Sequence, residues 1–180
     1  MIWFFTPYSF EKKMFEAWDR YLSLITDPND WACMLDGDTA FLLPDFGHQV
    51  QKYIDLFPDT GLFTCYASRT ANKDQLLNGI NSENTDLVFH RLQAEYCRET
   101  LYPKSKDIFK AYGHLMVIQK KTWVRIRPLV KKYTQNSGLL DTDTAVSRAV
   151  RKINLKIKVM EGMYILHYYR LKDKGRGHLL

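Results

Sequence analysis

Two aspartates separated by a glycine follow directly on a buried-strand pattern. Residues Trp31–Leu35 are all apolar, as in a strand buried on both faces, and Asp36, Gly37 and Asp38 come next. Repulsion between the carboxylates raises a pKa unless a cation or hydrogen-bond donors compensate. Hard divalent cations such as Mg²⁺ or Mn²⁺ prefer oxygen ligands and share their remaining sites with phosphates. The tripeptide therefore predicts either a divalent-cation site or a solvated turn.

Other residues with suitable chemistry stand late in the chain. Asp141 and Asp143 come just after Gly138 and open a helical pattern, and His167 ends the last apolar stretch. Carboxylates and imidazoles are side-chain types that can take part in acid–base chemistry. Each also has a structural explanation, because acids favour the positive end of a helix dipole and buried histidines are commonly hydrogen-bonded. Their occurrence together, in this order, indicates a site more strongly than any one of them.

Apolar periodicity assigns these residues to the ends of elements in an α/β domain. Ile2–Phe5 and Trp31–Leu35 are typical of parallel strands, joined by a helix over residues 10–25 that Ser9 caps, in a right-handed crossover. Ligands of open α/β sheets bind at the carboxyl ends of such strands. We predict a single domain over residues 1–180, with a mixed, mostly parallel sheet flanked by helices. The other predicted elements are helices over 44–57, 86–101, 121–133 (disturbed by Pro128) and from 142, and strands over 61–66, 114–119, 156–160 and 163–167, the last two joined at Glu161-Gly162.

Composition and charge restrict the class of protein. With 46% apolar and 14% aromatic residues the chain is globular, and no apolar run reaches the roughly 18 residues of a membrane span. The three cysteines are scattered and lack metal-ligand spacing, which predicts reduced core residues of a cytoplasmic protein. Residues 1–50 carry 3 basic against 8 acidic side chains (−5), and residues 104–180 carry 18 against 5 (+13). The basic half predicts attraction to phosphate, or peripheral contact with an anionic membrane at its inner face.

The order of these motifs resembles that of the GT-A glycosyltransferases, in particular compact bacterial relatives of the family-2 nucleotide-sugar transferases. The resemblance extends from the first strand to His167. It implies transfer of a sugar, with inversion, from a UDP- or GDP-sugar donor to a saccharide or lipid-linked acceptor, with Mn²⁺ or Mg²⁺ as cofactor. The residues that carry it are Thr6-Pro7-Tyr8 after the first strand, the DGD of 36–38 followed by Phe41-Leu42-Leu43, Asp141, Asp143 and His167.

The resemblance implies a metal site. Asp36 and Asp38 match the DxD motif that binds the metal and the donor, with Asp38 as the direct ligand and Asp36 nearer the ribose. His167 matches the late histidine that completes the metal site in the family. An imidazole ligand suits Mn²⁺ better than Mg²⁺.

The resemblance also implies a donor site. Thr6 and Pro7 would border the nucleotide base, on which Tyr8 would stack, and Gly37 would let the donor approach the backbone closely. Arg170 would add positive charge at the diphosphate. Only about 30 residues separate Pro7 from the DGD, a shorter nucleotide-binding half than the family has.

Asp141 resembles the catalytic base of inverting members, which deprotonates the acceptor hydroxyl as it attacks the anomeric carbon. The family pattern has Glu-Asp before this helix, whereas Leu140 precedes Asp141 here, and the spacing to Arg148 also departs from the pattern. Asp141 and Asp143 therefore compete for the role of base.

Two other functions fit parts of the sequence. A haloacid-dehalogenase-type phosphohydrolase also has an Asp-x-Asp after a strand and would use Thr64, Lys120 and the acids at 141 and 143, but Ala40 stands where that motif has Thr or Val. A nucleic-acid-binding domain would use the basic residues of 120–132, yet no nucleic-acid motif accompanies them. We therefore expect no nucleic-acid partner.

Overall fold

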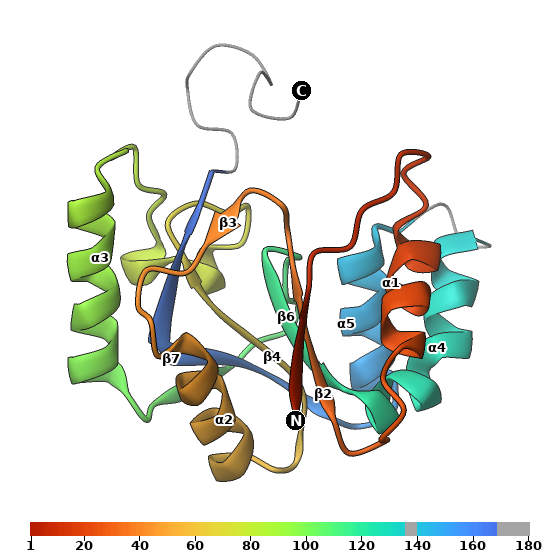
Figure 1. Ribbon diagram of the computed structural model, residues 1–180. Helices are drawn as coiled ribbons and strands as arrows, with labels where there is room; N and C mark the ends of the chain where they lie inside the picture. The colour runs from red at the N-terminus through yellow and green to blue at the C-terminus, as the bar shows by residue number, and fades with distance from the viewer. Residues whose placement is uncertain (136–139, 169–180) are drawn as a thin grey trace.

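A seven-stranded mixed sheet with helices on both faces forms the centre of the protein (Figure 1). The computed structural model describes residues 1–135 and 140–168. The predicted α/β class, with a mixed sheet flanked by helices, is confirmed. The strands are β1 (Ile2–Phe5), β2 (Trp31–Leu35), β3 (Thr39–Ala40), β4 (Thr60–Ala67), β5 (Ser105–Asp107), β6 (Leu115–Gln119) and β7 (Lys156–His167). The helices are α1 (Met14–Ser23), α2 (Phe46–Leu56), α3 (Leu87–Tyr96), α4 (Lys120–Gln135) and α5 (Thr142–Lys152).

Four strands of the sheet run in the same direction. The strand order is β1-β2-β6-β4-β7-β3, and β5 pairs with β7. β1 is parallel to β2 and β4 is parallel to β7, whereas β6 is antiparallel to both β2 and β4. The carboxyl ends of β1, β2, β4 and β7 therefore meet at one edge, beside the amino end of β6. The predicted parallel crossover from β1 through α1 to β2 is confirmed.

Strand β2, which lies between β1 and β6, contributes to two hydrophobic clusters. Ala32 and Met34 belong to the cluster built with α1, α4 and α5, and Trp31 and Cys33 belong to the cluster built with α2. This double burial accounts for the uninterrupted apolar run in the sequence. All three cysteines are buried free thiols, as predicted.

The first helix begins later than predicted. Phe10, the first residue of the predicted helix, is 88% exposed, and α1 starts only at Met14. Lys12 has a φ of 57°, a left-handed conformation that a right-handed helix does not include. The hydroxyl of Ser9 accepts a hydrogen bond from the amide of Lys13 at 2.8 Å, so Ser9 caps the turn that precedes the helix.

The two predicted C-terminal strands form one strand. β7 continues through Glu161 and Gly162, and its register against β4 shifts there, which indicates a bulge instead of a hairpin. Gly162 is needed for close packing, because a Cβ at this position would lie 2.8 Å from the hydroxyl of Tyr53. The Gly162 amide donates to that same hydroxyl at 2.7 Å. The chain thus reaches the edge of the sheet at His167 in a single pass.

The short strands β3 and β5 were not predicted, and the other elements follow the predictions with small changes. Pro128 lies inside α4 and does not interrupt it. The predicted helix over 86–101 is α3 followed by a π-helical turn, Cys97–Leu101. Residues 67–84, which have no clear periodicity, contain two short 3₁₀ turns, Lys73–Gln75 and Leu77–Gly79. Among the described helices, none is long and apolar enough to cross a membrane.

Candidate functional site

The turn that holds Asp36 and Asp38 lies between the carboxyl end of β2 and the start of β3. The Asp36 amide donates to the carbonyl of His114 at 3.3 Å, and the Asp36 carbonyl accepts from the hydroxyl of Thr39 at 2.7 Å. The Asp38 carbonyl accepts from the amide of Tyr168 at 3.0 Å. These bonds fix the turn, and its side chains remain accessible, with 47% of Asp36 and 20% of Asp38 exposed.

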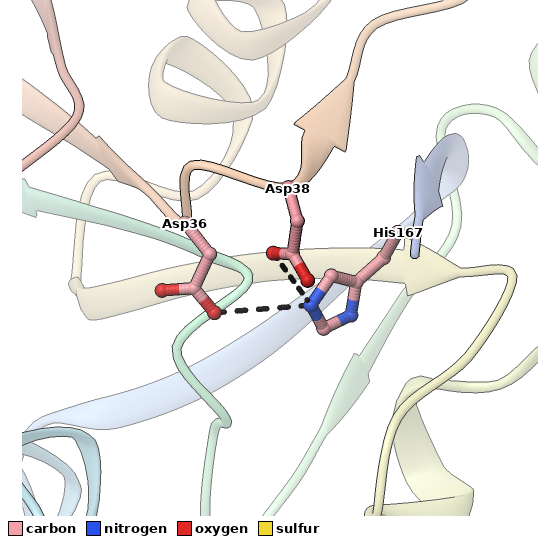
Figure 2. A group of neighbouring side chains, drawn as sticks. All are labelled: Asp36, Asp38 and His167. Atoms are coloured by element: carbon pink, nitrogen blue, oxygen red, sulfur yellow. Dashed lines mark ion pairs between the residues drawn. The ribbon is translucent and has the colours of Figure 1, made fainter. Parts of the chain in front are cut away.

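His167, the last residue of β7, is brought beside this turn because β7 pairs with β3. Its Nδ1 lies 2.7 Å from the carbonyl oxygen of Arg69, an acceptor that requires the proton to be on Nδ1. Nε2 lies 3.3 Å from Asp38 Oδ1 and 3.9 Å from Asp36 Oδ2 (Figure 2). The hydroxyl of Ser68 bonds to both the amide and the carbonyl of His167, at 2.9 and 3.0 Å, and holds the residue in place.

The donor atoms of these side chains fit a divalent cation. Asp36, Asp38 and His167 each offer one ligand atom, and these atoms all lie within 4.8 Å of one another. Two carboxylates and one imidazole suit Mn²⁺, and the carboxylates also suit Mg²⁺. Metal-binding histidines usually donate a hydrogen bond from the ring nitrogen that does not bind the metal, and the Arg69 carbonyl is the acceptor of such a bond here. The neutral imidazole would thus present the lone pair of Nε2 to a cation.

Burial, with a smaller effect of neighbouring acids, raises the pKa of two carboxyl groups. Burial, together with the charges of Asp38 and Asp143, raises the pKa of Asp36 to about 6, although His167 acts in the opposite direction. Burial also raises the pKa of Asp143, partly offset by the hydrogen bond from the Thr144 amide. A cation bound here would relieve this repulsion.

A cleft of about 300 Å³ lies over this edge of the sheet. Asp36 and His167 line it together with Asp141 and Asp143 from the start of α5. Gly113 lies between the two groups, since a Cβ at this position would be 3.5 Å from Asp36 Oδ1 and 3.8 Å from Asp143 Cβ. The missing side chain therefore keeps the space between the acids open. The other lining residues are Pro7, Met14, Trp18, Met34, Leu35, Thr70, Ala71, Tyr112 and His114.

Two members of the Asp36, Asp38 and His167 cluster thus line one cleft together with a second pair of acids. No protein-family model matches the chain, and no curated protein matches it in sequence. The chemistry of the cleft is therefore inferred from the chain's own residues.

The sequence patterns do not reveal two parts of the site. His167 donates a hydrogen bond to the backbone carbonyl of Arg69. Because every residue has such a carbonyl, no residue type in the sequence predicts this contact. Gly113 stands before a strand, where a glycine commonly ends a loop, and its place between two acids depends on how β6 and α5 pack.

His114 is buried, and its Nε2 lies 3.2 Å from the carbonyl oxygen of Cys65. Burial lowers the pKa of His114 to about 3, so it is neutral at physiological pH.

The residues predicted to bind the donor lie at different distances from the cleft. Pro7 lines it, and Thr6 is exposed beside Gly37, with its Cγ2 3.7 Å from the position of a Cβ on that glycine. Tyr8 is 74% exposed and is not among the described lining residues. Arg170 lies outside the described residues.

The residues required by a dehalogenase-type phosphohydrolase are not brought together. Lys120 lies at the opposite edge of the sheet, where its amide donates to the carbonyl of Asp30 and its Nζ donates to the carbonyl of Leu22 at 2.6 Å. Thr64 is fully buried and accepts a hydrogen bond from Gln75 at 2.7 Å. Neither residue is among the described residues that line the cleft, so the geometry disfavours this alternative.

Proposed function

We propose that the protein is a metal-dependent glycosyltransferase that moves a sugar from a UDP- or GDP-sugar to a hydroxyl of a saccharide or lipid-linked acceptor. One observation supports this proposal best. Asp36 and His167, two members of a cluster of two carboxylates and an imidazole, line a cleft together with a separate pair of acids, and Gly113 keeps the space between them open. The cluster suits the diphosphate half of the reaction, and the pair of acids suits the acceptor hydroxyl.

Asp36, Asp38 and His167 would hold Mn²⁺ or Mg²⁺. When bound, such a cation supplies positive charge to the leaving diphosphate. Asp36 is also exposed enough to contact the donor itself, with 47% of its side chain accessible. Pro7, which lines the cleft near this turn, would border the nucleotide.

Asp143 is better placed than Asp141 to act as the base. It lies beside the gap at Gly113 and is half-buried, whereas Asp141 is exposed at the first position before α5. Its raised pKa brings it closer to a working pH, which suits proton abstraction. The acceptor oxygen would bond to the anomeric carbon as the bond from that carbon to the diphosphate breaks. Asp143 would take the hydroxyl proton, and attack opposite the leaving group would invert the configuration.

Thermal shift tests the donor half of the proposal. The protein should be stabilised by Mn²⁺, and further by one UDP- or GDP-sugar in the presence of Mn²⁺. Asp38→Ala should abolish both shifts, whereas Asp59→Ala, which removes an exposed acid outside the cleft, should leave them unchanged. Full Mn²⁺ and nucleotide-sugar shifts in Asp38→Ala would contradict the proposal.

Exchange of each acid for its amide tests the acceptor half. Asp143→Asn should lower transfer at least about a hundredfold, the usual contribution of a general base, and should keep the Mn²⁺-dependent donor shift. Asp141→Asn should retain most of the transfer activity because its side chain is exposed. The reverse pattern would assign the base to Asp141.

A further inference from the structure

Helix α4 has an unusual charge. Its 16 residues, KKTWVRIRPLVKKYTQ, include six lysines and arginines and no acidic residue. A solvated helix face ordinarily carries charges of both signs, which pair along the helix. The excess of positive charge on α4 therefore needs an explanation beyond solubility.

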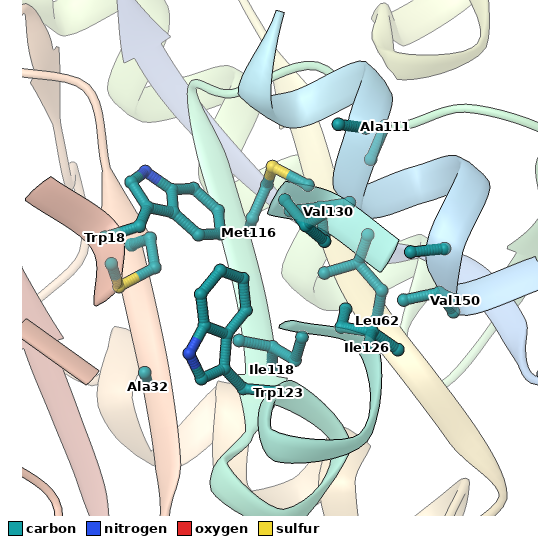
Figure 3. Packing of buried hydrophobic residues seen from close by; sticks show 14 of the residues in the cluster. Trp18, Ala32, Leu62, Ala111, Met116, Ile118, Trp123, Ile126, Val130 and Val150 are labelled. Carbon is teal, nitrogen blue, oxygen red and sulfur yellow. The ribbon is translucent and has the colours of Figure 1, made fainter. Parts of the chain in front are cut away.

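The positive charges gather on the outer face of α4. The inner face carries Trp123, Ile126 and Val130, which are buried in the core shared with α1 and α5 (Figure 3). Lys121, Arg125 and the other exposed cations face away from that core. Figure 1 shows α4 at the outer side of the helical layer formed with α1 and α5. A flat partner can therefore approach this face along the length of the helix.

Most of these cations have no ionic partner among the residues that the structure describes. Lys120 donates to the carbonyl of Leu22 at 2.6 Å, and Arg127 forms a two-point ion pair with Asp19 at 2.6 and 2.7 Å. The other four cations of the helix form no ion pair with any residue that the structure describes. They are Lys121, Arg125, Lys131 and Lys132.

We propose that the outer face of α4 docks on an anionic lipid bilayer. Val124, 57% exposed, and Pro128 lie among the cations, and this mixture of basic and apolar side chains is typical of helices that lie in a membrane interface. The cations extend from Lys121 to Lys132, about 16 Å along the helix axis, so a flat headgroup layer contacts them together. A nucleic acid would instead be expected to require base-stacking aromatic side chains or a groove-reading motif beside them, and the exposed face of α4 carries neither.

The docking face lies close to the candidate active site. Thr134 and Gln135, at the end of α4, line a second cavity together with Asp141 and Thr142. Asp141 and Thr142 also line the cleft. A bilayer in contact with α4 would therefore lie near the cleft, on the side of the acids. This position suits a lipid-linked acceptor, although the docking itself does not depend on the proposed transfer reaction.

Vesicle sedimentation of the full chain tests the proposal without metal or nucleotide, so its failure is distinct from failure of the proposed function. Vesicles of phosphatidylcholine with about one third phosphatidylglycerol should bind the protein at physiological ionic strength, and pure phosphatidylcholine should not. Each basic side chain near such a surface strengthens binding roughly fivefold, so Lys121→Glu/Arg125→Glu/Lys132→Glu, which removes three cations and adds three anions, should weaken binding by at least about a hundredfold.

A matched variant controls for net charge. Lys52→Glu/Lys73→Glu/Lys104→Glu changes three exposed lysines outside α4 and alters the net charge equally, so it should weaken binding less than fivefold. Circular dichroism and thermal melts would verify that both variants fold. An equal loss in the two variants, no binding of the wild type to the anionic vesicles, or tighter binding to duplex DNA than to vesicles would each overturn the proposal.

Discussion

Replacement of Asp36 by asparagine should stabilise the metal-free protein and remove its response to Mn²⁺. Burial and the charges of Asp38 and Asp143 disfavour the ionised form of Asp36, which is why its pKa is raised to about 6. Asparagine has nearly the same shape without the charge, so it relieves the repulsion and loses a metal ligand. A group that destabilises the fold and is needed for binding is typical of a functional site.

The size of the stability gain in Asp36→Asn follows from the raised pKa of Asp36. A change from 3.8 to about 6 corresponds to about 3 kcal/mol as an upper limit. Because 47% of the Asp36 side chain is exposed, water screens much of the repulsion, and we expect a gain of about 1 kcal/mol. In a chain of this size that gain raises Tm by about 2–4 °C.

The gain should depend on pH in a defined direction. Since the pKa of Asp36 is higher in the folded state, the folded protein binds more protons between pH 3.8 and about 6. The contribution of this group to stability therefore falls as pH rises through that window and stays constant above it. The advantage of Asp36→Asn should be full at about pH 7.5 and shrink to between about a third and about two thirds of that value at about pH 4.5.

Thermal melts of the two proteins at both pH values, with and without Mn²⁺, measure these effects. At a hundredfold excess over its Kd, Mn²⁺ should stabilise the wild type by about 2.7 kcal/mol, and Asp36→Asn should gain much less. A less stable Asp36→Asn at about pH 7.5 without metal would refute the reasoning, because it would mean that the carboxylate makes a net favourable contact.

Three further predictions concern the cleft and the core. Gly113→Ala should change the free energy of unfolding by less than about 1 kcal/mol, because Gly113 lacks a positive φ and a Cβ there meets only ordinary contacts. The added methyl group should nevertheless fill the gap between the acids and abolish the nucleotide-sugar shift in thermal melts. Trp123→Ala should cost about 3–5 kcal/mol in urea unfolding, because this side chain is 1% exposed in the main core; a loss under about 1 kcal/mol would contradict the packing. Asp19→Asn should cost about 1 kcal/mol at neutral pH, because hydrogen bonds from Arg127 lower the pKa of Asp19; in urea titrations the cost should vanish as pH falls from 3.8 through that lowered pKa.

Local patterns in the sequence were sufficient for the strand that carries the acids. Five apolar residues followed by Asp-Gly-Asp specify a strand buried on both faces and its polar end, without reference to the rest of the fold. The start of α1 could not be predicted in this way, because the left-handed conformation of Lys12 delays a helix whose apolar spacing begins at Phe10. The bulge at Gly162 likewise depends on the hydroxyl of Tyr53, more than a hundred residues away.

The position of His167 depends on tertiary pairing. The sequence indicates only that this residue ends the last apolar stretch, whereas its approach to Asp38 requires β3 to pair with β7 and β7 to pass Gly162 without a turn. Its orientation requires the carbonyl of Arg69, a group without a sequence signature. The acids could thus be proposed from sequence alone, and the completed ligand set could not.

The distribution of charge supports the proposal that the cleft binds a cation. The chain has 26 lysines and arginines and a net charge of +6. None of these side chains is among the described residues that line the cleft, although the cleft holds Asp36, Asp141 and Asp143. A basic residue at this edge of the sheet would pair with the acids and relieve their repulsion. The charge of His167 lowers the pKa of Asp36 and that of Lys110 lowers the pKa of Asp143, yet both pKa values stay raised, so we propose that an external ion completes the compensation.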